Sequence, residues 1–250
     1  MDKIPVLRTW LISQYGSNLR FATLYGSSVH GTHGPESDLD IIIVVESTIE
    51  TTLNDNGETT TKHHVDFGRI DISTYSEPKF REGVVSHDAQ ILEAVFIPSP
   101  YIIFGDQHLY RTLFVCYPPF IRTSFGEICR QTWNRGVKKL TLETDPRQIY
   151  VGKKSLYHAL RYFVLARQLH QTGAIHFEDP ELTEIKSLYL SYRDADLTEL
   201  VENGKLKDKY TQIYKIADQK FRQIPNEEQY SQQQKQQRKM KIKTSKKLDS

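Results

Sequence analysis

The side chains best suited to hold a divalent cation are Asp38 and Asp40, which stand one residue apart. They lie at the start of residues 39–45, LDIIIVV, an aliphatic and β-branched run that is typical of a buried strand. Side chains at positions i and i+2 of a strand project from the same face, so both carboxylates can offer oxygens to hard cations. We predict that Asp40 is substantially buried, because the residues that follow in the strand are almost all aliphatic. A divalent cation would offset the cost of burying its charge.

A second feature is the turn at Gly26 and Ser27, which follows a short strand predicted over residues 20–25. Glycine has no side chain, so backbone amides and the serine hydroxyl can approach phosphate oxygens there. The order of strand, Gly-Ser, loop and Asp-x-Asp predicts a site in which two cations, about 3.5 to 4 Å apart, hold phosphate groups for in-line displacement.

A third carboxylate normally completes such a site, and Asp66 and Asp71 are the two candidates. Their separation of five positions is odd, so in an unbroken strand they would face opposite ways. A bulge at Gly68 would weaken this parity. Spacing alone therefore does not choose between them.

The rest of the chain supplies the elements that would position these residues. Apolar residues recur at helical spacing near the N-terminus, and residues 64–67 and 69–75 alternate as one bulged strand or two short ones. A polar stretch over residues 47–61 provides turn chemistry. Helical periodicity then recurs in residues 87–96, 119–142, 149–171 and 195–222.

These elements predict an α+β fold, in which an N-terminal mixed β-sheet with flanking helices is followed by a C-terminal helical domain. We place the sheet domain at residues 1–105 and the helical domain, which would close over the cleft, at residues 106–225. Residues 226–250 are rich in Gln and Lys and are predicted to be a disordered basic tail.

Charge is concentrated in that tail. It holds seven Lys or Arg against three acidic residues, a net charge of +4, while the whole chain carries +2, so residues 1–225 carry −2. The body of the protein alone therefore gives no charge argument for nucleic acid. The tail could contact RNA phosphates, or it could be a solubilising terminus.

The composition argues against several classes of protein. Two cysteines, Cys116 and Cys129, supply neither a disulfide framework nor a CxxC metal site. The longest aliphatic run, residues 41–45, is too short to span a membrane, and Arg8 interrupts the N-terminal apolar segment. We expect an intracellular, cytoplasmic protein, and the basic tail is also compatible with nuclear import.

One polar stripe marks an otherwise apolar helix predicted near residues 153–169. Lys154, His158 and Arg161 fall at positions i, i+4 and i+7, and Gln168 extends the same face. Cations held among apolar neighbours suggest a polyanion such as a triphosphate. The alternative is an ordinary helix whose polar stripe faces water.

Histidines elsewhere do not form a zinc motif, because no short-spaced Cys or His pair is followed by a second one. We interpret them as solvated residues of loops and strand ends; they are His30, His33, His63 and His64.

The pattern of Gly-Ser, spacer and DxD resembles the polymerase-β nucleotidyltransferase superfamily. Residues 26–40, GSSVHGTHGPESDLD, are similar to its branch of predicted and RNA-repair-associated nucleotidyltransferases of phages and bacteria. The resemblance continues in residues 71–80, DISTYSEPKF, in residues 91–96, ILEAVF, and in residues 154–162, KSLYHALRY.

This resemblance implies transfer of a nucleoside monophosphate from an NTP to an acceptor hydroxyl, with pyrophosphate leaving and two Mg²⁺ or Mn²⁺ ions bound. RNA is the implied acceptor. The family's third carboxylate is followed four positions later by a tyrosine, which matches Asp71 and Tyr75 and favours Asp71 over Asp66. Asp38 and Asp40 would then bind both ions, and Asp71 would bind the catalytic one and help to deprotonate the attacking hydroxyl.

By the same resemblance, Ser27 contacts the triphosphate, and Lys154, His158 and Arg161 lie in the helical domain opposite the carboxylates. The sequence departs from the branch at residues 84–90, VVSHDAQ, where Gly-Asn-Pro is expected. Two alternatives stay open: the acceptor is a protein or small-molecule hydroxyl, or the chain is a non-catalytic module that binds nucleotide or RNA.

Overall fold

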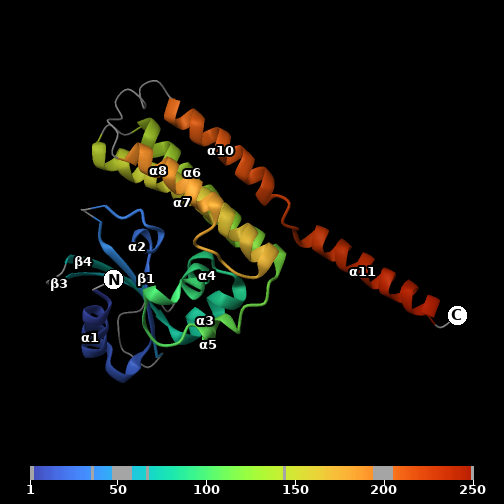
Figure 1. The fold of residues 1–250 in the computed structure, drawn as a ribbon, viewed down its shortest axis with the longest axis horizontal. Coiled ribbons are helices and arrows are strands. Elements are labelled where there is room, and N and C mark those ends of the chain that lie inside the picture. Colours follow the sequence, from blue (N-terminus) through green and yellow to red (C-terminus); the bar gives the residue numbers. More distant parts are fainter. Residues whose placement is uncertain are drawn as a thin grey trace. The chain divides into compact units, whose positions relative to one another are not determined.

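The computed structural model describes residues 3–34, 37–46, 58–65, 68–142, 145–193 and 205–248. The chain divides into two compact units (Figure 1). The first comprises Met1–Val115 and Ala174–Ala195, and the second comprises Cys116–Gly173 and Asp196–Ser250. The sheet domain therefore extends ten residues beyond the boundary expected at residue 105. It also includes Ala174–Ala195, which we expected to belong to the helical domain.

A five-stranded sheet in the order β3-β4-β2-β1-β5 forms the core of the first unit. Its strands are β1 (Leu19–Tyr25), β2 (Leu39–Val45), β3 (Glu58–Val65), β4 (Gly68–Ser76) and β5 (Ile102–Phe104). The pair β2 and β4 is parallel, and the other pairs are antiparallel. The sheet is thus mixed, as predicted, and the aliphatic run of β2 is buried from Ile41 to Val45.

Helices flank this sheet. They are α1 (Lys3–Tyr15), α2 (Ser27–His30), α3 (Glu77–Ser86), α4 (Ala89–Phe96), α5 (His108–Arg111) and α8 (Pro180–Arg193), with 3-10 turns at Gly16–Asn18 and Ser99–Tyr101. Side chains cap the starts of several of these helices, including α3 and α4. Ser76 accepts a bond from the amide of Lys79 at the start of α3, and Asp88 accepts bonds from the amides of Gln90 and Ile91 at the start of α4.

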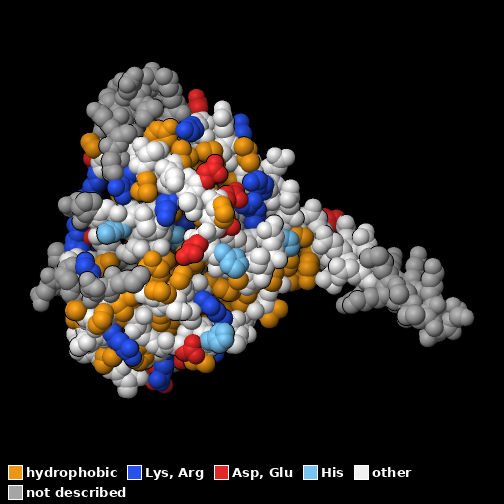
Figure 2. All heavy atoms as spheres, in the orientation of Figure 1, with side chains coloured by type: hydrophobic (Ala, Val, Ile, Leu, Met, Phe, Trp, Pro, Cys, Tyr) orange, Lys and Arg blue, Asp and Glu red, His pale blue; other side chains and the backbone are white. Residues whose placement is uncertain are grey.

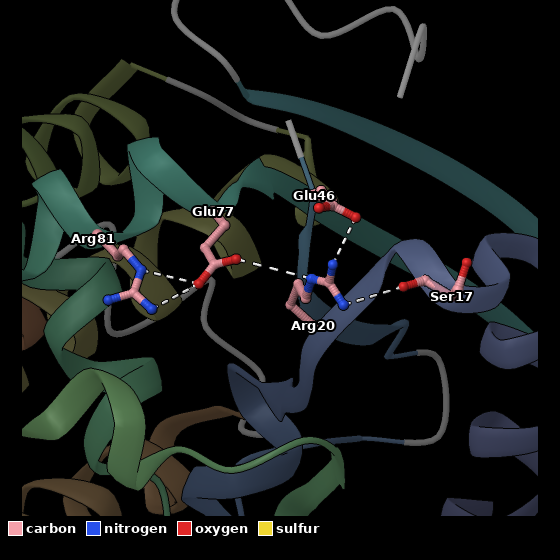
Figure 3. A network of polar contacts seen from close by, with 5 residues as sticks. All are labelled: Ser17, Arg20, Glu46, Glu77 and Arg81. Carbon is pink, nitrogen blue, oxygen red and sulfur yellow. Dashed lines mark hydrogen bonds and ion pairs between the residues drawn. The ribbon is translucent and has the colours of Figure 1, made fainter. Parts of the chain in front are cut away.

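A surface network fixes the strand ends that lie away from Asp38 and Asp40 (Figure 3). Arg20 of β1 pairs with Glu46 at 2.6 Å, lies 3.9 Å from Glu77 of α3, and donates to the carbonyl of Ser17. Glu77 in turn accepts two bonds from Arg81. Because the pairs are partly exposed, each contributes only about 0 to 1 kcal/mol. The network therefore orients α3 against the sheet more than it stabilises the fold.

The second unit is helical, with α6 (Pro118–Leu142), α7 (Pro146–Thr172), α10 (Lys205–Phe221) and α11 (Glu227–Leu248). Glycines let α6 and α7 approach closely. A Cβ atom at Gly136 would meet the side chain of Leu156 and would lie 3.0 Å from the carbonyl oxygen of Gly152. Aromatic contacts join α10 to the pair, with Trp133 stacked on Tyr214 at 4.1 Å between ring centroids.

The predicted α+β fold class, with its N-terminal sheet and C-terminal helical part, is confirmed. One predicted boundary was wrong, and one helix was missed. Strand β3 begins at Glu58, within the stretch interpreted as a turn, because its three threonines favour a strand and pair with β4. A helix over residues 180–193 was not predicted, although its buried residues Leu182, Ile185 and Tyr189 recur at helical spacing.

The predicted disordered tail is instead helix α11 over Glu227–Leu248. Gln, Glu and Lys are good helix formers, so a polar composition does not exclude a helix. Asn226 and Gln229 also exchange reciprocal bonds between side chain and amide, which caps the first turn. Tyr117 at the start of α6 then donates to Glu227, and its ring meets that of Tyr230.

Figure 2 shows basic and acidic side chains intermixed over the face in view. This agrees with the near balance of charge in residues 1–225. Among the residues that the structure describes, no helix is both long enough and apolar enough to cross a membrane.

Candidate active site

One row of residues across four neighbouring strands defines the site. Asp40 of β2 is the register partner of Asp71 in the parallel strand β4, and Asp71 is in turn opposite Lys62 of β3. On its other side Asp40 is opposite Tyr25 of β1. Register partners project from the same face, and neighbouring strands lie about 4.8 Å apart. The strand register thus brings Asp40 and Asp71 together on one face.

Asp38 precedes Asp40 by two residues, and its carboxylate forms an ion pair with Arg69 of β4. Its Oδ1 lies 2.6 Å from Nε of Arg69 in β4. The side chain of Asp38 is 29% exposed. We predicted that Asp40 is substantially buried, but it is only half-buried. It lies at the open end of β2, before the buried run begins.

Two cations at this site were missed by the sequence reasoning. Besides Arg69, Lys62 donates to Oδ2 of Asp71 at 2.9 Å. That hydrogen bond raises the pKa of Lys62, and the charge of Asp71 adds to the shift. A signal existed for Arg69 alone, since it opens the alternating segment of residues 69–75 that contains Asp71. The hairpin register that brings them to Asp38 and Asp71 was not readable from composition.

Gly26 is required by its backbone and by its neighbour. Its φ of +64° lies in the region that favours glycine. A Cβ atom there would collide with Oδ2 of Asp40. The glycine of the Gly-Ser turn thus lets the strand end pass directly over the Asp40 carboxylate, so the turn and the carboxylates form one site.

Ser27 follows this glycine as the first residue of α2 and is 2% exposed. Its Oγ has no hydrogen-bond partner among the residues that the structure describes. A buried hydroxyl without a partner is costly, and such groups in native structures commonly serve a bound ligand. This observation is compatible with the phosphate contact expected of Ser27.

His30 corrects our interpretation of the histidines. It is 8% exposed and stacks on Phe177 at 5.3 Å, and its Nε2 contacts Oε1 of the fully buried Glu93. Oε2 of Glu93 accepts a bond of 3.0 Å from the hydroxyl of Tyr25. Sequence reasoning failed here because Glu93 lies 63 residues away in the chain.

The alternative third carboxylate, Asp66, lies outside the described residues. The two strands that flank it are separate, since β3 ends at Val65 and β4 begins at Gly68. Asp71 remains the carboxylate that the register places beside Asp40.

The predicted stripe in the second unit lies on α7. Arg161 is 1% exposed, Gln168 is 6% exposed, and Lys154 and His158 are half-buried. The alternative of a stripe that simply faces water therefore fails for Arg161. Its charge also acts on Cys129 of α6, whose thiol pKa is raised by burial and lowered in part by Arg161.

The three aspartates fit divalent cations in chemistry, since carboxylate oxygens are the ligands that Mg²⁺ prefers, and the strand register places Asp40 beside Asp71. Their side chains are not gathered around one point, and no group of three metal-binding side chains forms among the described residues. Instead, Arg69 pairs with Asp38 and Lys62 pairs with Asp71. The chain's own cations neutralise the charge that metal ions would neutralise.

Known proteins that resemble this chain include one family and one solved structure. Residues 11–94 match the family model described as polymerase beta, nucleotidyltransferase. The crystal structure of a nucleotidyltransferase-like protein from Exiguobacterium sibiricum 255-15 is similar over 88% of this chain and 74% of its own, at 12% identity and a TM-score of 0.34. No curated protein sequence matches the chain.

The matched segment lies within the first unit and contains the candidate site. Residues 11–94, which contain β1 to β4 and the three aspartates, form a polymerase-β-type nucleotidyltransferase domain. The narrower likeness to the RNA-repair branch stays a prediction.

Proposed function

We propose that this protein transfers a nucleoside monophosphate from an NTP to a hydroxyl of RNA and releases pyrophosphate. The observation that carries the proposal is the row in which Asp40 lies directly opposite Asp71, with Asp38 two residues earlier in the chain. A binding module would gain nothing from carboxylates that must be kept neutralised by Lys62 and Arg69.

Asp38, Asp40 and Asp71 would hold two Mg²⁺ or Mn²⁺ ions. When bound, such ions orient the attacking and leaving oxygens and neutralise the charge that develops on the phosphates. The chain's own groups position the reactants. The turn at Gly26 and Ser27 would contact the phosphates, and an oxygen of Asp71 would accept the proton of the attacking hydroxyl.

The second unit would contribute Lys154, His158 and Arg161, which share one face of α7. Positive groups in a partly buried setting attract phosphate oxygens more strongly than exposed ones do, because water screens them less. We assign these three residues to the triphosphate.

RNA is the proposed acceptor because the sequence resembles an RNA-repair branch and because the chain carries a strongly basic C-terminal segment. Phosphate neutralisation by Lys and Arg supplies most non-specific affinity for nucleic acid. A protein or small-molecule acceptor is a distinct outcome of the test below.

The test is incorporation of each labelled NTP into total RNA, with Mg²⁺, by the wild type and by single aspartate variants. We expect Asp40→Asn and Asp71→Asn to lose labelling by on the order of a hundredfold or more, since each removes a charge on which transition-state stabilisation depends. Asp66→Asn is the matched control and should retain it. Circular dichroism would verify that each variant is folded.

Equal labelling by wild type and Asp40→Asn would overturn the site. The same assay with protein substrates and small alcohols tests the acceptor. Label that enters either of these and not RNA would overturn the RNA assignment while leaving the chemistry in place.

A further inference from the structure

The carboxylate of Glu93 in α4 is the most deeply buried ionisable group of the first unit that the proposed chemistry does not use. It is fully buried, with 0% of its surface exposed. Burying a carboxylate costs several kcal/mol unless its oxygens are partnered. Here both are, since Oε1 contacts Nε2 of His30 and Oε2 accepts the bond from the hydroxyl of Tyr25.

These two partners stand on either side of the Gly-Ser turn. Tyr25 is the last residue of β1, and His30 is the last residue of α2. Gly26 and Ser27 lie between them. One carboxylate therefore holds the strand that enters the turn and the helix that leaves it.

The turn needs such a restraint, because its local structure is weak. Helix α2 has four residues, far fewer than an isolated helix needs to be stable in water. Gly26, with φ of +64°, has more conformational freedom than any other residue type would have there. Without an outside contact, the position of Ser27 would be loosely defined.

The restraint also reaches the metal-binding side of the site. Tyr25 is the register partner of Asp40, and the Asp40 carboxylate occupies the space beside Gly26. A displacement of the strand end would therefore move the turn against Asp40. On the other side, His30 is held by its stacking on Phe177.

We propose that Glu93 is a positioning residue for the triphosphate, which acts through Tyr25 and His30 to fix the Gly26–Ser27 turn. This inference rests on the proposed function. It assigns a task to a buried network that could otherwise serve only the stability of the fold. The two roles differ in one measurable property. A positioning role affects ligands that reach the turn with their phosphates, whereas a purely structural role affects all ligands or none.

The experiment measures binding and not turnover. Equilibrium titrations with ATP and with AMP, both in Mg²⁺, would be made on wild type, Glu93→Gln and Tyr25→Phe. Glu93→Gln keeps the volume and removes the charge, and Tyr25→Phe removes one hydroxyl. We expect each variant to raise the Kd for ATP, on the order of tenfold for Glu93→Gln, as loss of outer partners of a site commonly does. The Kd for AMP should change by less than about twofold, because AMP lacks the β and γ phosphates.

Val95→Ala is the matched control. Val95 is fully buried in the same helix and contacts the site through none of these bonds. It should lower the melting temperature and leave both Kd values unchanged. Tyr25→Phe keeps the test decisive if Glu93→Gln fails to fold.

Two failures are distinguishable. A wild type that binds no ATP in Mg²⁺ would refute the proposed function. If the wild type binds ATP, two results would overturn the positioning role alone. One is a Kd for ATP in Glu93→Gln or Tyr25→Phe that equals the wild-type value. The other is a rise in Kd that is equal for ATP and for AMP.

Discussion

Single residues of this site show how a cluster of carboxylates is kept neutral by the chain itself. Asp71 is held by Lys62 and Asp38 by Arg69. Lys62 carries its charge at neutral pH, as lysines ordinarily do, and the bond to Asp71 raises its pKa further. A divalent cation that binds Asp71 must share or displace this ammonium group. Lys62 is therefore expected to compete with the metal.

The first prediction concerns this competition. Lys62→Met removes the ammonium group and keeps most of the side chain's length, so we expect the Mg²⁺ concentration for half-maximal labelling to fall by about twofold. The effect is small because the side chain of Lys62 is 76% exposed and water screens the pair. The measurement is a Mg²⁺ titration of the labelling reaction at constant ionic strength.

Lys79→Met is the control, since Lys79 pairs with Glu82 on α3 and belongs to no part of the row. It should leave the titration unchanged. If Lys62→Met needed more Mg²⁺ than the wild type, Lys62 would be helping to hold the substrate instead of competing with the ion.

At the level of elements, the sequence predicted best what depends on neighbours in the chain. The bounds of β2 agree with the aliphatic run of residues 39–45, because burial on both faces makes such a strand continuous in composition. The parallel pairing of β2 with β4 was beyond this reasoning. It joins segments about thirty residues apart, and it is this pairing that places Asp71 beside Asp40.

Long-range contacts explain the other misses in the same way. The residues near His30 in the sequence do not predict its contact with Glu93. The composition of the basic, Gln-rich segment predicts disorder, but bonds with Tyr117 and Asn226 hold the first turn of its helix. Local composition sets which elements can form, whereas contacts distant in sequence decide which residues meet.

The second prediction concerns the packing of α6 on α7. Alanine usually stabilises a helix interior by up to about 1 kcal/mol relative to glycine. At Gly136 we expect the opposite, because a Cβ would collide with Leu156 and press on the backbone of Gly152. Such overpacking costs about 1 to 3 kcal/mol, so Gly136→Ala should lower the free energy of unfolding. Urea unfolding followed by circular dichroism measures it.

Gly126 in the same helix provides the comparison. A Cβ there would meet only the ring of Phe221, at 3.4 Å, which is close to ordinary contact. Gly126→Ala should therefore be neutral or stabilising. If both variants shifted stability in the same direction, close approach of α6 and α7 at Gly136 would not be the controlling factor.

For the molecule as a whole, the two ends of the C-terminal helix α11 differ: its start contacts α6, and its later part carries the basic residues. Residues near its start contact α6, since Tyr117 bonds Glu227 and Arg122 donates to Gln229 at 3.1 Å. All seven Lys and Arg residues of the segment 226–250 lie at position 235 or later. A deletion of residues 235–250 therefore removes the cations while keeping the docking contacts.

The third prediction uses this separation to test the RNA assignment. Deletion of residues 235–250 should leave the melting temperature unchanged and weaken association with single-stranded RNA. The slope of log affinity against log salt should become shallower by about 0.7 for each RNA phosphate that the segment neutralises in the full chain.

Deletion from residue 227 onward also removes Glu227 and Tyr230, so it should lower the melting temperature as well. RNA binding measured by fluorescence anisotropy at several salt concentrations gives the slope. An unchanged slope in the shorter deletion would mean that the basic segment does not bind RNA, and RNA as the acceptor would then have no physical support from this chain.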